Sequence, residues 1–205
     1  GAEIEEDNAK KLEMLDKAVR LAPEAAEPLR ARAAVHAAMG KEESAAADFA
    51  KAIALDPDDL DTHENQARFL AEMGQFDRAL VSLDRARALA PRSVVPLTMR
   101  AQVHVQMGNL NAALHDLNEA LALQPDHPIV LLLRATLYHE TRKPDAALAD
   151  LNRVLRREPD LAQARRLRWI VLMGEGKLDQ VVEEMEAQLK KTPEDQTILI
   201  QMAML

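Results

Sequence analysis

Proline recurs along this chain with a period of 34 residues. The six prolines in register are Pro23, Pro57, Pro91, Pro125, Pro159 and Pro193. A fixed period of about 20–50 residues indicates a stack of similar supersecondary units. Because each unit of such a stack contacts mainly its neighbours, the array offers an extended surface for binding. The period therefore favours a binding groove over a catalytic centre as the functional site.

Other residues recur with the same period and define one unit. We place five full repeats at 26–59, 60–93, 94–127, 128–161 and 162–195. Position 8 of the repeat holds Ala33, Ala67, Ala101, Ala135 and Trp169, and position 20 holds Ala45, Ala79, Ala113, Ala147 and Val181. Position 24 holds the large apolar residues Phe49, Leu83, Leu117, Leu151 and Met185. Small residues beside large apolar ones are typical of two closely packed helices.

The turn between these helices is also predictable. Position 15 is glycine in every full repeat except the fourth, where Arg142 replaces it. Glycine supplies the left-handed conformation that ends a helix, and the proline at position 32 stops the second helix. Each repeat is thus predicted to hold helix A at about positions 2–14 and helix B at about positions 18–30. In repeat four we expect Pro144 to begin helix B, with a turn altered in shape but not lost.

This pattern resembles the tetratricopeptide repeat family over nearly the whole chain. The family has small residues at positions 8, 20 and 27, a large apolar residue at position 24 and proline at position 32. The resemblance implies an all-α, right-handed solenoid of antiparallel helix pairs, forming a single superhelical array over 1–205. Residues 1–25 are expected to be a partial repeat supplying helix B, and residues 196–205 a lone helix A.

Positions 7 and 23 predict a polar bridge inside each repeat. Position 7 holds Arg32, Gln66, Arg100, Arg134 and Arg168, and position 23 holds Asp48, Ser82, Asp116, Asp150 and Glu184. The repeat that has no arginine at position 7 also has no carboxylate at position 23. We therefore expect an arginine–carboxylate pair between helices A and B, with the bidentate geometry that arginine favours.

Family resemblance also implies that helix A lines a concave surface with positions 2, 5, 6, 9, 12 and 13. These positions are small in repeat one, mainly acidic in repeat two, and apolar over repeats three to five. Contiguous exposed apolar area usually marks an interface, and an amphipathic helix or an extended apolar peptide is the expected ligand. The predicted binding residues are Val95, Met99, Gln102, Ile129, Leu132, Leu133, Thr136, His139, Arg166 and Ile170. Alternatively, a tight superhelix packs these residues together, or a neighbouring segment of the parent protein fills the groove.

One subset of the family binds the acidic tails of heat-shock chaperones through a carboxylate clamp. Asn65 matches one clamp position, but Ala34, Val95 and Met99 stand where the clamp needs polar or basic residues. The resemblance therefore does not extend to that function.

Composition and motifs exclude several other functions. The net charge of −8 argues against a general nucleic-acid binder. The absence of cysteine excludes thiolate metal sites, and the histidines have no zinc-site spacing. No run of about 18 apolar residues predicts a membrane span, and no signal peptide is recognised. We find no phosphate-binding loop or nucleophile motif, so neither a cofactor nor an enzymatic activity is expected.

Self-association is the alternative function that the sequence leaves open. The segment 196–205 is almost uncharged and apolar, so it is a candidate contact between copies in a structural module of a larger repeat protein. Repeat five departs most from the pattern, since Trp169 stands where the other repeats have alanine. A tryptophan in an alanine-sized gap strains the pair unless the helices separate, so we expect a wider spacing between helices A and B or a local bend there.

Overall fold

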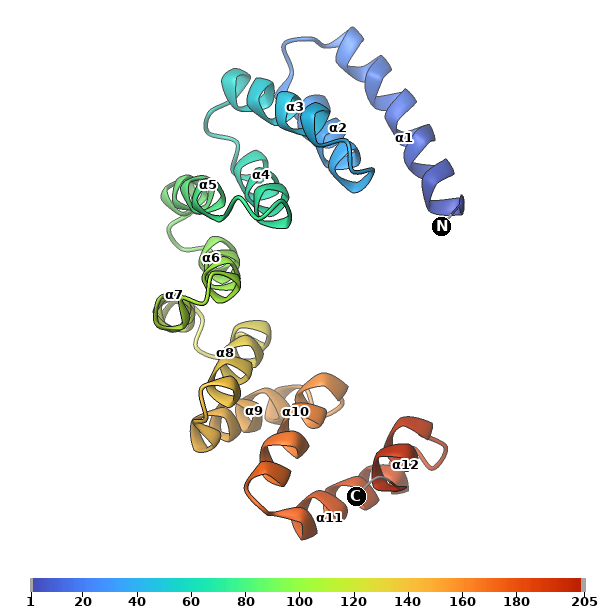
Figure 1. Ribbon diagram of the computed structural model, residues 1–205, viewed down its shortest axis with the longest axis vertical. Coiled ribbons are helices and arrows are strands. Elements are labelled where there is room, and N and C mark those ends of the chain that lie inside the picture. Colours follow the sequence, from blue (N-terminus) through green and yellow to red (C-terminus); the bar gives the residue numbers. More distant parts are fainter. Residues whose placement is uncertain (1, 204–205) are drawn as a thin grey trace. The chain divides into compact units, whose positions relative to one another are not determined.

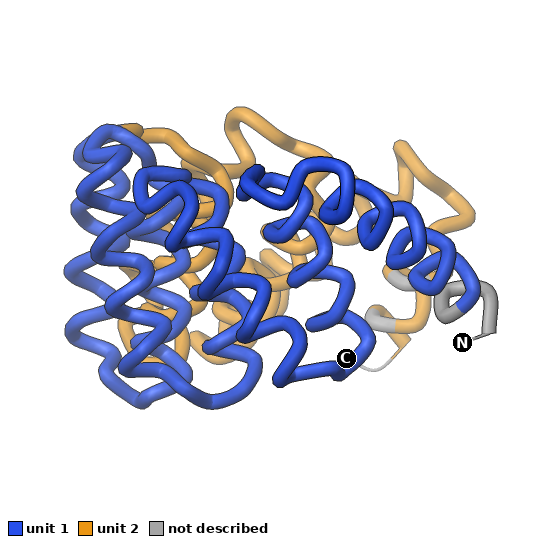
Figure 2. Tube along the Cα trace, turned by 90° about the horizontal axis from the view of Figure 1, so that it is seen from above, with its two compact units in different colours: residues 1–123 blue, residues 124–205 orange. Residues whose placement is uncertain are grey.

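The computed structural model of the protein describes residues 2–203. These residues form twelve α-helices and no strand (Figure 1). The helices are α1 (Ala2–Leu21), α2 (Ala26–Ala38), α3 (Glu42–Leu55), α4 (Leu60–Glu72), α5 (Phe76–Leu89), α6 (Val94–Gln106), α7 (Leu110–Leu123), α8 (Pro128–Glu140), α9 (Pro144–Arg157), α10 (Ala162–Gly174), α11 (Leu178–Lys191) and α12 (Gln196–Ala203). The chain divides into two compact units, Gly1–Leu123 and Gln124–Leu205 (Figure 2).

The N-terminal unit is built of two layers of helices. Helices α2, α4 and α6 lie on one side, and α3, α5 and α7 lie on the other (Figure 1). Each helix of the first layer packs against the next helix in the chain, and α4 also contacts α2 and α6. In the C-terminal unit, α8 packs on α9, and α10 contacts both of them. The predicted all-α fold of paired helices is confirmed, while the exact division into full and partial repeats remains a prediction.

The recurring small residues lie where the paired helices touch. Ala33 and Ala45 of the first pair are fully buried, as are Ala135 and Ala147 of α8 and α9. Their short side chains let the helix backbones approach closely, and large residues such as Phe49 fill the space beside them. Burial of this apolar surface is the main source of stability for such pairs.

The turns between paired helices share one conformation, including the one without glycine. Gly74 has φ of 70°, its N–H donates to the Ala71 carbonyl at 3.0 Å, and the next N–H bonds the carbonyl of Leu70 at 2.8 Å. Arg142 has φ of 55°, and the equivalent bonds have lengths of 3.0 and 2.8 Å. Our expectation of an altered turn in repeat four is therefore wrong. The two backbone hydrogen bonds hold the turn, and Arg142 adopts a conformation that is costly for a residue with a Cβ.

Trp169 is buried in the last full helix pair, and the packing of that pair is looser than in the other repeats, in agreement with the expected wider spacing. Its side chain is only 3% exposed and packs in a cluster with Leu172, Val181, Met185 and Ile198. Helices α10 and α11 contact each other less extensively than the paired helices of the preceding repeats do. The indole thus occupies space that the other repeats close with alanine.

Candidate functional site

The predicted arginine–carboxylate pair forms in each repeat that has arginine at position 7 and a carboxylate at position 23. Arg32 and Arg134 each make two bonds of 2.7 Å to Asp48 and Asp150, respectively. The corresponding pairs are Arg100 with Asp116 at 2.9 and 2.5 Å, and Arg168 with Glu184 at 2.5 Å. In repeat two, Ser82 donates to the amide oxygen of Gln66 at 2.8 Å instead. These bonds fix helix A against helix B and so set the direction of the A-helix faces.

Two of these arginines also reach back to the preceding helix B, a contact that sequence reasoning missed. Arg32 bonds Asp16 of α1 at 2.9 Å, and Arg100 bonds Asp84 of α5 at 2.6 Å. In both cases the carboxylate lies 16 residues before the arginine, as far as the first partner lies after it. That symmetrical spacing is the signal by which the second carboxylate could have been found. The hydrogen bonds that Arg32 donates to Asp48 and Arg100 donates to Asp116 raise the pKa of both arginines above its ordinary value, with smaller contributions from Asp16 and Asp84 and with burial opposing the rise.

The predicted groove residues of the C-terminal unit lie on α8 and α10, which contact each other. Ile129 is 60% exposed and Ile170 is 47% exposed, whereas Leu132 is buried at 8% exposure. Leu133, Thr136 and His139 are half-buried and Arg166 is exposed. Thr136 donates its hydroxyl to the Leu132 carbonyl at 3.0 Å, so that its polar group is already bonded. The accessible apolar surface on these helices therefore centres on the two isoleucines.

The remaining predicted residues belong to α6 of the N-terminal unit. Val95 is 45% exposed, Gln102 is exposed and Met99 is half-buried. Met99 also packs against the apolar core of that unit. Of these three residues, Val95 thus offers the most accessible apolar side chain.

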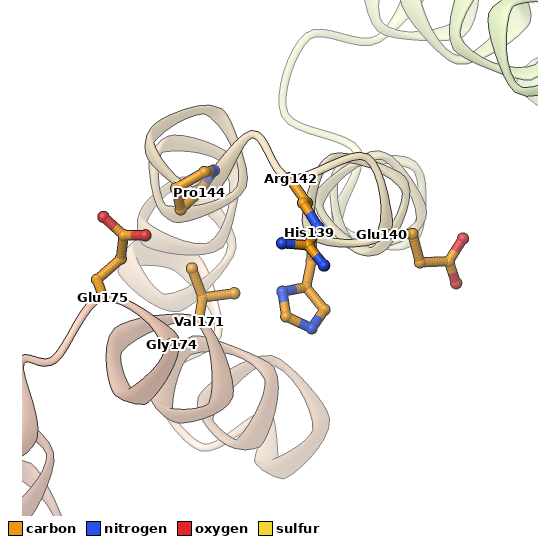
Figure 3. A pocket seen from close by; sticks show the side chains of 7 residues that line it. All are labelled: His139, Glu140, Arg142, Pro144, Val171, Gly174 and Glu175. Carbon is orange, nitrogen blue, oxygen red and sulfur yellow. The ribbon is translucent and has the colours of Figure 1, made fainter.

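A cavity of about 610 Å³ lies where α8, α9 and α10 approach one another (Figure 3). The residues that line it are His139, Glu140, Arg142, Pro144, Val171, Gly174 and Glu175. The ring of His139 is directed toward α10, while Glu140 points away from it (Figure 3). Of the predicted binding residues, only His139 contributes to this cavity. Its lining mixes hydrogen-bond donors, carboxylates and one valine, without the nucleophile and base pair that catalysis by covalent attack requires.

A second, smaller hollow of about 230 Å³ lies between α2 and α4 of the N-terminal unit. It is lined by Ala34, Ala37, Ala38, Phe49, Asn65, Arg68, Phe69 and Glu72. The sequence analysis noted only that these positions of repeat one are small. Their small size leaves the space open, so a run of alanines on a groove-facing helix was the available signal.

Charged clusters elsewhere are satisfied by the protein's own side chains. His115, Asp116 and Glu119 place three potential metal ligands within 4.8 Å of one another. However, Asp116 already accepts two bonds from Arg100, and Glu119 pairs with Arg87 at 2.7 Å. Because these arginines supply the neutralising charge, the cluster is better explained as a network of ion pairs than as a metal site.

The basic stretch near the end of α9 and the start of α10 is likewise partly paired. Arg153 bonds Asp126 at 2.9 Å and thereby holds the pKa of that carboxyl below its ordinary value. Arg165 donates to the Pro159 carbonyl at 3.0 Å, and Arg168 bonds Glu184. Arg156 and Arg166 of this stretch are exposed and form no salt bridge among the described residues, so the internal pairing is partial.

In the part of the chain that the structure describes, no helix combines the length and apolar character needed to cross a bilayer.

Three solved structures illustrate the similarity of the fold. PilW, described as a widely conserved type IV pilus biogenesis factor, is 17% identical, with 96% of this chain and 91% of that chain covered and a TM-score of 0.80. The pilF protein of Pseudomonas aeruginosa is 19% identical. The alignment covers 98% of this chain and 99% of that chain, with a TM-score of 0.71. YrrB, described as a TPR protein with an unusual peptide-binding site, is 18% identical, with 93% and 98% covered and a TM-score of 0.65.

Comparison with protein families gives the same result from the sequence. Three family profiles, each described as tetratricopeptide repeat, match residues 66–137, 49–81 and 31–59. A search of curated proteins gives no significant match. The matched segments join into one stretch of more than half the chain, and they carry the alanine and glycine positions described above. The chain belongs to the tetratricopeptide repeat family.

Proposed function

We propose that this chain is a non-catalytic scaffold that binds a protein or peptide segment through the apolar faces of its A helices. The family and the solved structures of the same fold support the general role, because tetratricopeptide repeats typically hold other proteins. The finer proposal places one contact on α8 and α10 of the C-terminal unit. Val95, Met99 and Gln102 of α6 are proposed as binding residues of the N-terminal unit, considered by themselves.

The observation that carries this proposal is the exposure of Ile129 and Ile170 on the A helices of one unit. Full burial of a large apolar side chain contributes about 1.5–3 kcal/mol, so two such residues are suited to anchor a partner. They fit an apolar ligand such as an amphipathic helix, whose anchors recur on one face. Arg166, which is exposed on the same helix as Ile170, adds a donor for polar groups of the ligand.

YrrB provides support of a different kind. Its description names a peptide-binding site in a chain of the same fold, with most of both chains covered. At 18% identity, this similarity supports a peptide as the class of ligand. It does not indicate which side chains that peptide carries.

The test is affinity capture from native lysate with the intact chain and a variant carrying Ile129→Glu and Ile170→Glu. Both positions are exposed, so the variant is expected to fold, and its helicity is checked by circular dichroism. Val81→Glu is the matched control, since Val81 is 70% exposed but lies on α5, a B helix. A protein captured by the intact chain and by the control, but lost with the double variant, supports the proposal. Equal capture by all three places the binding site elsewhere.

Self-association through α12 is the second candidate. Leu199 and Ile200 of this helix are 46% and 60% exposed, an apolar surface that a second copy is able to cover. Sedimentation velocity over a hundredfold range of concentration tests this candidate. A rise in mass that Ile200→Glu abolishes supports it, and a constant monomer mass rejects it.

A further inference from the structure

Three departures from the repeat pattern meet at the cavity between α8, α9 and α10. Arg142 replaces the glycine of the turn, Pro144 begins α9, and Gly174 stands at position 13 of repeat five. Position 13 of repeats two to four holds larger polar residues, Glu72, Gln106 and Glu140. All three departures line the same cavity of about 610 Å³ (Figure 3). Positions where a sequence breaks its own rules are expected to be strained or functional.

Arg142 occupies this place at a conformational cost. Its φ is 55°, and the glycines at the same place in the other four repeats have φ of 69–76°. A side chain is disfavoured in this left-handed region, and the turn itself needs only backbone hydrogen bonds. The fold therefore does not explain the guanidinium. Strained residues of this kind are concentrated at functional sites.

The polar side chains of the lining keep their hydrogen-bonding groups. In the described part of the chain, the side chains of Arg142, His139 and Glu175 form no hydrogen bond and no salt bridge with other residues. Arg142 and Glu175 are exposed, and His139 is half-buried. All three are therefore able to bond a ligand without breaking a contact of the fold.

These groups are arranged with an apolar surface between opposite charges. Val171 and Pro144 lie between Glu175 on one side and Arg142 with His139 on the other (Figure 3). Val171 is buried and belongs to α10, so its position is fixed by the core. The cavity thus presents donors at one end, hydrocarbon in the middle and a carboxylate at the other end.

Other charged residues near the cavity do not alter this arrangement. Glu140 is part of the lining, but its side chain points away from α10 (Figure 3). Lys143, Asp145 and Lys177 lie within two residues of the lining in the chain, and all three are exposed and outside it. Because solvent and salt screen such exposed charges, the nearest charges to a ligand are those of the lining itself.

The volume and the charges together restrict the ligand. A volume of about 610 Å³ falls within the roughly 300–1,000 Å³ of small-molecule sites. Gly174 keeps this space open, since an added Cβ there meets no atom within 4 Å. A guanidinium suits a carboxylate, but a simple anion also meets Glu175, and a simple cation also meets Arg142. A ligand that carries both charges is complementary to both ends.

We propose that this cavity binds a small zwitterion of the ω-amino carboxylate class. Its carboxylate accepts bonds from Arg142 and His139, its ammonium group donates to Glu175, and its aliphatic chain lies over Val171. This site is a small-molecule site in addition to the proposed protein-binding surface, and it does not rest on that function. Ile129 and Ile170, which carry the protein-binding proposal, do not line the cavity.

Three compounds with the same carbon chain test the assignment of the charges. δ-Aminovalerate carries both charges, valerate only the carboxylate and pentylamine only the ammonium group. Each is titrated to millimolar concentration into the full ¹⁵N-labelled chain at constant ionic strength and followed by NMR. We expect δ-aminovalerate to bind at least about tenfold more tightly than either of the others, with shifts at the amides of Arg142, Gly174 and Glu175.

Substitutions at each end of the cavity make the test specific. Arg142→Gly installs the residue that the other four repeats have, so the variant is expected to fold and yet to bind δ-aminovalerate no more tightly than pentylamine. Glu175→Gln is expected to reduce δ-aminovalerate to the affinity of valerate. Gly174→Gln places the residue of repeat three in the open space and is expected to weaken all three compounds. Arg156→Gln removes a charge from an exposed position of α9 outside the lining and, as the control, keeps the affinity.

The proposal is overturned if valerate or pentylamine binds as tightly as δ-aminovalerate, because the site then recognises a single charge. It is also overturned if none of the three compounds shifts the amides at the cavity, or if folded Arg142→Gly keeps the preference for δ-aminovalerate. The Ile129→Glu, Ile170→Glu variant is expected to bind δ-aminovalerate normally. A failure of this site is therefore distinguishable from a failure of the proposed protein-binding function.

Discussion

The guanidinium of Arg134 donates two parallel bonds of 2.7 Å to the carboxylate of Asp150. Arg134 lies on α8 and Asp150 on α9, so the pair joins the two helices of one repeat. Asp150 is buried, and its charge is therefore stabilised by this arginine, and more weakly by Arg153 at 3.9 Å, rather than by water. Replacing a buried ion pair by apolar residues is often neutral, whereas removing one partner leaves an uncompensated charge.

Arg134→Met is accordingly expected to lower the free energy of unfolding by about 3–5 kcal/mol. Arg134→Met combined with Asp150→Leu is expected to recover most of that loss, because no buried charge then remains. Urea denaturation of both single variants and of the double variant measures the effect. Arg156→Met, at an exposed position without a salt bridge in the described structure, is the control and is expected to change stability by less than about 0.5 kcal/mol. A double variant as unstable as the sum of the two single variants contradicts this account.

The left-handed conformation of Arg142 leads to a stabilising substitution. At φ of 55° a residue with a Cβ is strained by about 1–2 kcal/mol, and glycine relieves the strain at some cost in unfolded-state entropy. We expect Arg142→Gly to raise the stability by about 0.5–1 kcal/mol. Thermal unfolding checks this value.

The reciprocal control is Gly108→Ala, at φ of 76°. An added Cβ at Gly108 meets no atom within 4 Å, so any loss of stability there comes from backbone conformation alone. A loss of about 1 kcal/mol is expected. If Arg142→Gly destabilises the protein, the side chain of Arg142 makes a contribution larger than its backbone strain.

Trp169→Ala is expected to destabilise the protein by about 3–5 kcal/mol, because it removes a large buried side chain and leaves a cavity. Trp169→Phe keeps an aromatic ring in the cluster and is expected to cost less than Trp169→Ala, its loss combining a smaller cavity with a missing hydrogen bond. It removes the indole N–H that donates to Glu184 at 3.1 Å, and about 1 kcal/mol is expected for that bond. Chemical denaturation measures both variants. Unchanged stability in Trp169→Ala would show that the indole does not fill the space between α10 and α11.

His36 makes the stability depend on pH. Burial lowers the pKa of this imidazole, with a smaller lowering from Lys41 and Arg32, while Asp48 and Asp16 oppose the shift. In the unfolded chain the pKa is about 6.5, so the unfolded state binds the proton more readily. The stability due to the neutral ring is therefore complete above about pH 6.5 and is lost as the pH falls through the lower pKa of the folded state.

His36→Gln is expected to reduce the loss of unfolding free energy between pH 7 and pH 5. The matched control is His115→Gln, since the side chain of His115 is 72% exposed. Urea denaturation at several pH values compares the three proteins. A pH profile for His36→Gln that coincides with that of the unchanged protein contradicts the assignment.

Much of the fold was predictable because its signals are local and repeated. The alanines at positions 8 and 20, the glycine turn and the spacing of Arg134 from Asp150 each specify a contact within one repeat. Five copies of the pattern reinforce one another, so the helix pairing and its polar bridges could be predicted from the sequence alone. Arg142 shows the limit of residue-type reasoning, since the backbone hydrogen bonds of the turn outweigh the preference of the side chain.

The sequence by itself determined which helices pair and which faces they turn toward each other, since periodicity assigns each residue to a face. Tertiary structure decided what those faces expose. Ile129 and Leu132 were predicted to share one surface, yet only the isoleucine is accessible. Likewise Ala34 and Ala37 became part of a hollow only because α4 lies beside α2 at a distance that their short side chains do not fill. Accessible area and empty volume depend on the packing of neighbouring repeats, and no single repeat encodes that packing in its own pattern.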